Sequence, residues 1–212
     1  MWPDSSQTQE LLTRAAGGSS AAVNELLERH RGALVRMIAM RMDRMVQRRV
    51  DASDIVQDVL VEANRRLDEY LTDRKLPFHL WLRQMARDRM IDAHRRHRTA
   101  ARRSVDREQA LPHAAFDDQS ALDLAALLHD RELTPAAAAT RQELETRFRS
   151  AIAELDETDR EVILMRHFEQ LSNQEVAQSL GLSQPAAGMR YLRALRRLRT
   201  LLNDEAPEGS AP

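Results

Sequence analysis

Apolar residues recur every three or four positions through the first half of the chain, which is the spacing of one face of an α-helix. The first such run extends from Ala21 to about Met45, with arginines on its other faces. A second run begins after Asp51, a residue type that caps helix N-termini, and reaches Leu67. A third extends from about Phe78 to Arg96. The pattern therefore predicts three or four amphipathic helices in this half.

The second half contains a helix-turn-helix pattern between Leu155 and Leu202. Ser172 and Glu175 have the spacing of a capping box, in which each side chain bonds the backbone N–H of the other residue. Gly181 can take the positive φ that ends a helix, and Ser183 can cap the next one. Two short helices joined in this way expose the start of the second helix, which enters the DNA major groove in such motifs. The residues predicted to lie nearest the bases are Gln184, Ala186, Ala187, Gly188 and Arg190.

An arginine-rich face follows on the second of these helices. Leucines and Tyr191 alternate with the arginines at helical spacing, so one face can pack while the other stays cationic. No acidic residue occurs between Glu175 and Asp204, so the arginines lack a local partner four residues away. Such a stripe can simply solvate a surface helix, but after a helix-turn-helix pattern we interpret it as a phosphate-binding surface. Its members are Arg190, Arg193, Arg196, Arg197 and Arg199.

Composition favours an all-α protein of two small helical domains. Of the 212 residues, 42% are hydrophobic, 31% are charged and 4% are aromatic, which suits helices better than a sheet sandwich. The net charge of -1 hides separate basic and acidic segments. The absence of cysteine excludes a disulfide framework and a thiolate metal site. The start of the chain lacks the features of a signal peptide, and no apolar run approaches the roughly 20 residues that span a bilayer, so we expect a cytoplasmic protein without membrane insertion.

A change in composition separates the two halves. From about Ser104 to Thr140 the helical spacing is lost, two prolines occur and acidic residues outnumber basic ones. We interpret 104–140 as a flexible acidic linker with a short helix near Ala121 to Leu128, joining domains at 18–103 and 141–202. Two roles fit this composition. The linker could be a spacer without contacts that keeps two basic domains apart, or its acids could mimic nucleic acid.

The third predicted helix combines Phe78 and Trp81 with arginines that become dense toward its end. Aromatic rings beside cations are typical of surfaces that bind unpaired bases, where stacking contributes about 1–3 kcal/mol per base. Aromatic residues three apart on a helix usually face inward, however, and for Trp81 we favour packing in the core. Packing does not explain the arginines of this segment, which are Arg83, Arg87, Arg89, Arg95, Arg96, Arg98, Arg102 and Arg103.

Three segments resemble sigma factors of bacterial RNA polymerase, in particular the extracytoplasmic-function (ECF) group. DASDIVQDVLVEANRRLDEY is similar to the segment that binds the polymerase, and FHLWLRQMARDRMIDAHRR to the helix that melts the downstream promoter element. The helix-turn-helix segment is similar to the domain that reads the upstream element. The resemblance covers nearly the whole chain. It implies a protein that is not an enzyme, has no cofactor, and binds promoter DNA and core RNA polymerase, on the largest-subunit clamp helices and the flap.

The resemblance also assigns roles to individual residues. It implies polymerase binding by Asp51, Asp54, Ile55, Val56, Gln57 and Asp58. It implies contact with the melted downstream element by Arg74, Lys75, Phe78, Trp81, Arg87, Asp88, Arg95 and Arg96. Recognition of the upstream element is implied for Gln184, Ala187, Gly188, Arg190, Arg193 and Arg197. Asp88 and Gly188 depart from the family pattern, which has a polar amide and often a basic residue there. An anti-sigma protein, a kinase or transcription of the gene itself could control activity.

Two other classes of protein fit parts of the chain. A stand-alone helix-turn-helix regulator would explain the second half, but it leaves the first half without a task. His94 and His97, three residues apart, could ligate a metal in an enzyme. Their arginine-rich surroundings would repel a cation, and the sequence offers no evident third ligand, phosphate-binding loop or nucleophile elbow. DNA footprinting with and without core polymerase would distinguish the regulator from the sigma factor.

Overall fold

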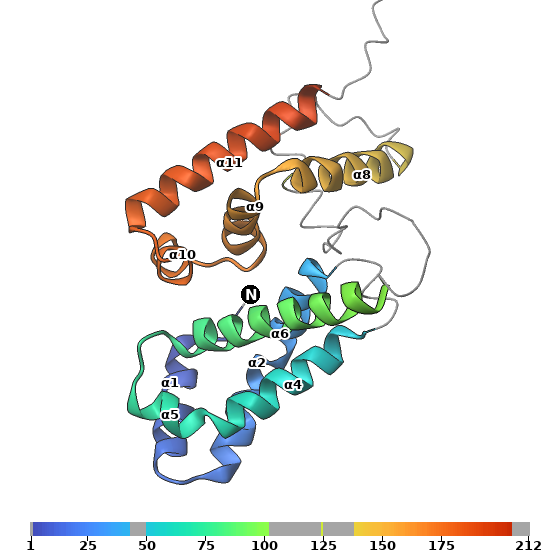
Figure 1. The fold of residues 1–212 in the computed structure, drawn as a ribbon. Coiled ribbons are helices and arrows are strands. Elements are labelled where there is room, and N and C mark those ends of the chain that lie inside the picture. Colours follow the sequence, from blue (N-terminus) through green and yellow to red (C-terminus); the bar gives the residue numbers. More distant parts are fainter. Residues whose placement is uncertain (1, 43–49, 102–123, 125–137, 205–212) are drawn as a thin grey trace, which may run out of the picture. The chain divides into compact units, whose positions relative to one another are not determined.

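The computed structural model describes residues 2–42, 50–101, 124 and 138–204, and every regular element within these ranges is a helix (Figure 1). The chain divides into two compact units, Met1–Ala115 and Phe116–Pro212. The predicted all-α fold is therefore confirmed. The predicted linker lies almost entirely outside the described residues. Of the short helix expected within it, only Leu124 is described, and this residue is helical and buried.

Helix α2 is the central helix of the first unit and packs against α1, α4 and α6. Polar side chains cap the helix N-termini where the sequence provides them. The Ser19 hydroxyl accepts a hydrogen bond from the Ala22 N–H at 3.3 Å, and the Asp51 carboxylate accepts one from the Ser53 N–H at 2.8 Å. Asp51 therefore caps a helix, as predicted. The helices described in this unit are α1 (Ser5–Ala16), α2 (Ser20–Arg41), α4 (Ala52–Arg65), α5 (Leu67–Thr72) and α6 (Phe78–Ala101).

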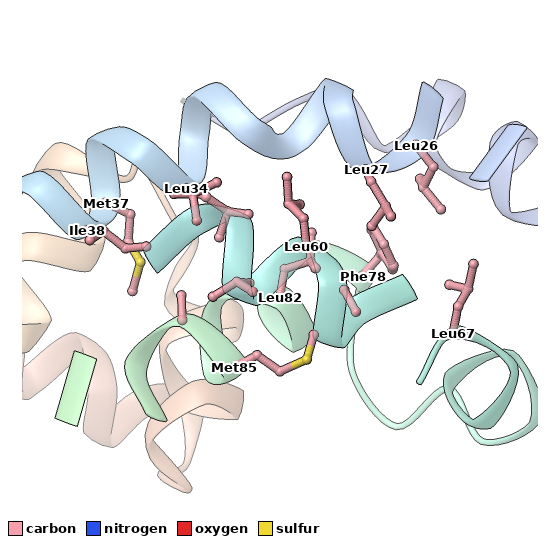
Figure 2. Close-up of a cluster of buried hydrophobic side chains, with 14 of the residues drawn as sticks. Leu26, Leu27, Leu34, Met37, Ile38, Leu60, Leu67, Phe78, Leu82 and Met85 are labelled. Carbon is pink, nitrogen blue, oxygen red and sulfur yellow. The ribbon is translucent and has the colours of Figure 1, made fainter. Parts of the chain in front are cut away.

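The core of the first unit is formed by the apolar faces of α2, α4 and α6 (Figure 2). These side chains are nearly or completely buried, and each contributes roughly 1.5–3 kcal/mol relative to exposure. Because the apolar faces turn inward, the polar faces of α4 and α6 turn outward. The labelled core residues are Leu26, Leu27, Leu34, Met37, Ile38, Leu60, Leu67, Phe78, Leu82 and Met85.

Helix α1 is absent from the elements predicted above. Its buried residues Thr8, Leu11, Leu12 and Ala15 follow the helical spacing, and the Asp4 carboxylate caps its start by accepting from the Ser6 and Gln7 N–H groups. The signal was weak because only two of the four buried side chains are large and apolar. The helix nevertheless adds Leu11 and Leu12 to the core of the first unit.

The second unit contains the predicted helix-turn-helix. The Ser172 hydroxyl accepts from the Glu175 N–H at 3.2 Å and the Glu175 carboxylate accepts from the Ser172 N–H at 2.7 Å, so the capping box is confirmed. Gly181 has φ 65° and ends the first helix, and the Ser183 hydroxyl accepts from the Ala186 N–H at 3.3 Å to begin the second. The elements described here are α8 (Ala138–Glu154), α9 (Glu157–Ile163), the π-helix η1 (Leu164–Phe168), α10 (Asn173–Leu180) and α11 (Gln184–Asp204).

Arginine side chains join the helices of the second unit through backbone carbonyls. Arg160 of α9 donates hydrogen bonds to the carbonyl oxygens of Ile152, Ala153 and Leu155 at 3.0, 2.6 and 2.9 Å. The last carbonyls of a helix have no partner within it, so Arg160 satisfies the C-terminal end of α8. Arg147 of α8 donates to the Leu202 carbonyl of α11 at 2.6 Å. α8 is thereby connected to both α9 and α11.

Candidate nucleic-acid and protein interfaces

The outward face of α4 is acidic. Asp51, Asp54, Gln57 and Asp58 are all exposed along its first two turns. The Gln57 amide oxygen accepts a hydrogen bond from Arg31 of α2 at 3.2 Å, which orients this side chain at the edge of the face. The structure thus brings four of the six residues predicted to bind the polymerase onto one surface.

The other two residues of that set do not lie on the surface. Ile55 is 5% exposed and Val56 is fully buried, and both belong to the core of the first unit. They hold α4 in place, so a protein that binds the acidic face would contact the polar residues and not these two. Helical spacing explains the division, because successive residues of a helix point about 100° apart, so neighbours in one motif can face the core and the solvent.

Aromatic rings gather where α5, α6 and the loop between them meet. Tyr70 and Trp81 lie with ring centroids 4.6 Å apart, and Phe78 lies 5.4 Å from Tyr70 and 5.5 Å from Trp81. The Tyr70 hydroxyl donates to the Leu76 carbonyl at 3.0 Å and so fastens the loop to α5. Phe78 is 2% exposed and Trp81 is partly buried against the core. Trp81 therefore packs against the core, as the sequence analysis favoured. The Phe78 ring is buried and is not accessible to a base.

The loop of the first unit carries two exposed cations, Arg74 and Lys75. The Lys75 ammonium lies 2.6 Å from the Asp73 carboxylate, and this hydrogen bond raises the pKa of Lys75. Tyr70 joins this loop to the aromatic cluster, because its hydroxyl bonds Leu76 and its ring packs on Trp81. Of the two aromatic residues predicted to contact DNA, Trp81 is partly exposed and Phe78 is buried.

The outward face of α6 has mixed charge. Arg87, Asp88, Arg95 and Arg96 are exposed, as is Asp92, whose backbone carbonyl accepts from Arg96 at 3.3 Å. The side chains beyond residue 96, including His97 and the arginines predicted at 98, 102 and 103, lie outside the described residues. Within the described part, the cations of α6 are interleaved with carboxylates.

The outward face of α11 lacks acidic residues until the end of the helix. Gln184, Arg193 and Arg197 are exposed on it, as predicted for residues that contact DNA. The opposite face packs on α9 and α10. The buried side chains of that face are Ala187, Ala194, Leu198, Leu201 and Leu202.

Arg190 has an ion-pair partner, contrary to the expectation of an unpaired cationic stripe. Its guanidinium donates a hydrogen bond to the Asp159 carboxylate at 2.9 Å and lies 3.9 Å from that of Asp156. The Arg190 side chain is only 31% exposed. Burial and the neighbouring Asp156 raise the pKa of Asp159, whereas the Asp159 N–H and side chain lower the pKa of Asp156. Arg190 thus fastens α11 to α9, across 31 positions of sequence that local charge patterns do not reveal.

Ala187 and Gly188 lie on the side of α11 that faces α10, and not on its outward face. Ala187 is 1% exposed, which contradicts its predicted place nearest the bases. A side-chain carbon at Gly188 would lie 3.2 Å from the Asn173 amide nitrogen, closer than ordinary contact. A side chain at this position would therefore require the Asn173 amide to move slightly.

Comparison with known proteins matches both units. The family model Sigma-70 region 2 matches residues 26–100, and Sigma-70, region 4 matches residues 145–198. The RNA polymerase sigma factor CnrH of Cupriavidus metallidurans is 34% identical over 197 residues, covering 92% of this chain and 94% of the relative. The chain belongs to the ECF group of sigma-70 factors.

Other sigma factors are also similar over most of the chain, at lower sequence identity. NccH of Alcaligenes xylosoxydans xylosoxydans is 29% identical over 204 residues, covering 94% of this chain and 96% of the relative. The ECF sigma factor SigD of Mycobacterium tuberculosis is 26% identical over 189 residues, covering 89% and 81%. A solved structure of CnrH in complex with the cytosolic domain of CnrY superposes with TM-score 0.59 at 27% identity, covering 94% of this chain and 99% of that one.

Membership of this family decides between the predicted classes. As a sigma factor, the protein binds core RNA polymerase and directs transcription from promoters, and the match to region 2 gives the first unit the task that a stand-alone regulator would not. Sigma factors are generally not enzymes. Among the helices that the structure describes, none combines the length and the apolar character needed to span a membrane. The described residues hold no group of three metal-ligating side chains, and His94 is partly buried.

Two structural features of this sigma factor do not follow from the sequence analysis. Asp156 and Asp159 lie before the helix-turn-helix and engage its second helix. Met189 and Leu192 are exposed on the outward face of α11, although both are apolar. The spacing of Met189 from the buried Ala187 and Ala194 could have placed it outward, since it lies on the opposite side of a 3.6-residue helix.

Proposed function

We propose that the acidic face of α4 binds the clamp helices of the polymerase largest subunit and that the second unit binds the flap and the upstream promoter element. The supporting observation is the separation of roles on α4, where Ile55 and Val56 are buried while the polar residues of the same motif are exposed. Exposed carboxylates suit a basic protein partner and would be repelled by DNA phosphates.

The promoter-opening surface in this proposal consists of the loop cations and the outward face of α6. Arg74 and Lys75 would attract the DNA backbone, and the partly exposed Trp81 would be the aromatic side chain available to a base. Arg87, Arg95 and Arg96 would continue along the strand, with Asp88 excluding phosphate locally. Phe78 would contribute by holding Trp81 and Tyr70 in position.

The upstream surface in this proposal is the outward face of α11. Gln184 lies at the start of the helix, where a recognition helix meets base edges, and Arg193 and Arg197 follow where it meets phosphates. Arg190 acts as a positioning residue, because its guanidinium binds Asp159 and fixes the angle of α11 on α9.

A reciprocal experiment tests the division of labour. The double variant Asp54→Ala with Gln57→Ala should lose retention on immobilised core polymerase by at least tenfold, while Arg193→Ala keeps it. Arg193→Ala should lose upstream promoter binding by the assembled holoenzyme. Asp68→Ala, an exposed acid on α5, is the matched control and should behave as wild type. Full retention of polymerase by the α4 double variant would remove the assignment to that face.

Control of activity and location are the remaining parts of the proposal. The solved structure of the similar CnrH contains the cytosolic domain of CnrY. By analogy we infer a protein inhibitor whose cytosolic part binds this chain, and a cytoplasmic location, where polymerase acts. Purification of the chain from cells of its source, before and after stress, should recover it with the inhibitor and then with polymerase.

A further inference from the structure

The outward face of α11 changes character along its length. In its first half the exposed positions include Gln184, Met189 and Leu192, which carry no charge. The exposed cations Arg193 and Arg196 follow. Met189, Leu192 and these two arginines follow helical spacing and lie opposite the buried side chains that pack on α9 and α10, whereas Gln184 lies in the first turn. In Figure 1, α10 meets the N-terminal end of α11, so these uncharged positions lie toward the end next to the turn.

The apolar side chains in this first half are prominent. Met189 is 55% exposed and Leu192 is 47% exposed, and they are two of the four large apolar residues exposed among the described residues. A single exposed apolar residue is ordinary, but these two lie three positions apart and therefore side by side on the helix surface. Neither contributes to the core of the unit, so their exposure calls for an interaction outside the chain.

The neighbours of Met189 and Leu192 on the helix differ in what they can offer to DNA. Arg190 is turned toward α9 by its bond to Asp159. Gly188 has no side chain to offer. The exposed groups that could meet a base edge near the start of the helix are the Gln184 amide, the Arg193 guanidinium, and the Met189 and Leu192 side chains. In the major groove, an apolar side chain has one specific counterpart, the 5-methyl group of thymine.

We infer that Met189 and Leu192 read thymine methyl groups in the upstream promoter element. The inference rests on the proposed role of α11 as the recognition helix and names the base feature that it recognises. Charge complementarity favours DNA as the occupant, because Arg193 and Arg196 continue the same face and suit phosphates on either side of the groove. An apolar protein partner would not need those cations.

Replacement of thymine by uracil tests this inference, since uracil lacks only the 5-methyl group. Holoenzyme assembled from the full chain and core polymerase first selects promoters from DNA randomised over the upstream element. Each thymine of the selected element is then replaced by uracil, and the relative affinity is measured by competition. At least one replacement should weaken binding about fourfold, the effect of losing one buried methyl-sized group.

Variants then connect the methyl preference to the two side chains. Met189→Ala or Leu192→Ala should abolish the thymine preference at one position while keeping the thermal stability of the chain, because both side chains are exposed. Arg193→Ala is the matched control and should weaken binding to all probes alike, leaving the thymine-to-uracil ratio unchanged.

Two results would overturn the inference. One is a selected element without thymine on either strand in the contacted positions. The other is a thymine-to-uracil ratio that is the same in both alanine variants as in the wild type while the holoenzyme still initiates transcription, which would leave the proposed function standing. Failure of the chain to bind core polymerase would instead refute the proposed function, and this inference with it.

Discussion

Helices α6 and α11 both direct arginines toward solvent, but different interactions hold them in place. The start of α6 is anchored by aromatic packing, with Phe78 buried against Tyr70. The start of α11 is fixed by the ion pair between Arg190 and Asp159. Apolar packing is insensitive to salt, whereas a partly exposed ion pair is weakened by it. The two surfaces proposed to bind DNA should therefore respond differently to ionic conditions.

The two helices also differ in the charge between their arginines. Asp88 and Asp92 interrupt the cations of α6, whereas α11 has no acid before Asp204. Each phosphate neutralised by a cation adds to the salt dependence of binding, and a neighbouring carboxylate offsets that gain. We therefore expect α11 to attract a DNA duplex over a longer range than the described part of α6 does.

The largest effect is expected where the aromatic anchor is removed. Phe78→Ala should lower the free energy of unfolding of the first unit by about 3–5 kcal/mol, because the ring is almost completely buried. Urea unfolding followed by circular dichroism measures this, with Phe78→Leu as a milder control. A loss below about 1 kcal/mol would show that α6 is not held by aromatic packing.

Acid should affect the first unit more than the second, because His30 is buried there. Burial lowers the pKa of His30 to about 4, with Nδ1 2.8 Å from the Leu26 carbonyl. In the unfolded chain His30 binds a proton near pH 6.5, whereas in the folded chain it stays neutral until about pH 4. The free energy of unfolding is therefore unaffected by His30 above pH 6.5 and decreases as the pH falls from 6.5 to 4. The loss should reach about 3 kcal/mol.

Unfolding free energies measured between pH 7 and pH 4 check this expectation. The slope should be smaller in His30→Gln, which has no titratable group at that position. An unchanged slope in the variant would mean that other groups cause the acid sensitivity.

A smaller effect is expected from the ion pair that positions α11. Arg190→Ala should destabilise the second unit by at most about 1 kcal/mol, since both partners are partly exposed to water. A double-mutant cycle with Asp159→Asn should give a coupling that falls at high salt. Promoter binding by the holoenzyme should fall in both single variants, although Asp159 carries a charge that DNA repels. Wild-type promoter binding by Asp159→Asn would contradict the positioning role.

The smallest effect is expected at Gly188. Gly188→Ala gains roughly 0.5–1 kcal/mol of helix propensity but places a carbon 3.2 Å from the Asn173 side chain. The two terms nearly cancel, so the midpoint of thermal unfolding should change little. Gly188→Leu is the sharper comparison, because its larger side chain must displace the Asn173 side chain further and should lower both stability and promoter binding.

Local signals in the sequence were sufficient for the helix-turn-helix and for the helices of the core. Ser172, Glu175 and Gly181 act within a few residues of one another, so their spacing predicts their hydrogen bonds and backbone angles. The apolar spacing around Val56 and Leu82 likewise predicts which face is buried. Both patterns depend on helix geometry alone, which the sequence determines locally.

Contacts between distant segments could not be predicted in this way. The partner of Arg190 lies in another helix, and the burial of Ala187 depends on how α10 crosses α11. A list of motif residues also does not distinguish those that touch a partner from those that support them, as Val56 and Phe78 illustrate. Helix α1 was missed because two large apolar residues gave too weak a pattern.

Arg160 joins the end of α8 to α9 through three backbone carbonyls, and this connection bears on how promoter choice can evolve. Arg160 follows Asp159 directly, so the residue that closes the end of α8 adjoins the one that holds Arg190. A shift of α8 would be transmitted through this pair of adjacent residues to the angle at which α11 meets DNA. Substitutions at the α8–α9 junction should therefore change which promoters are preferred without altering any side chain that reaches a base.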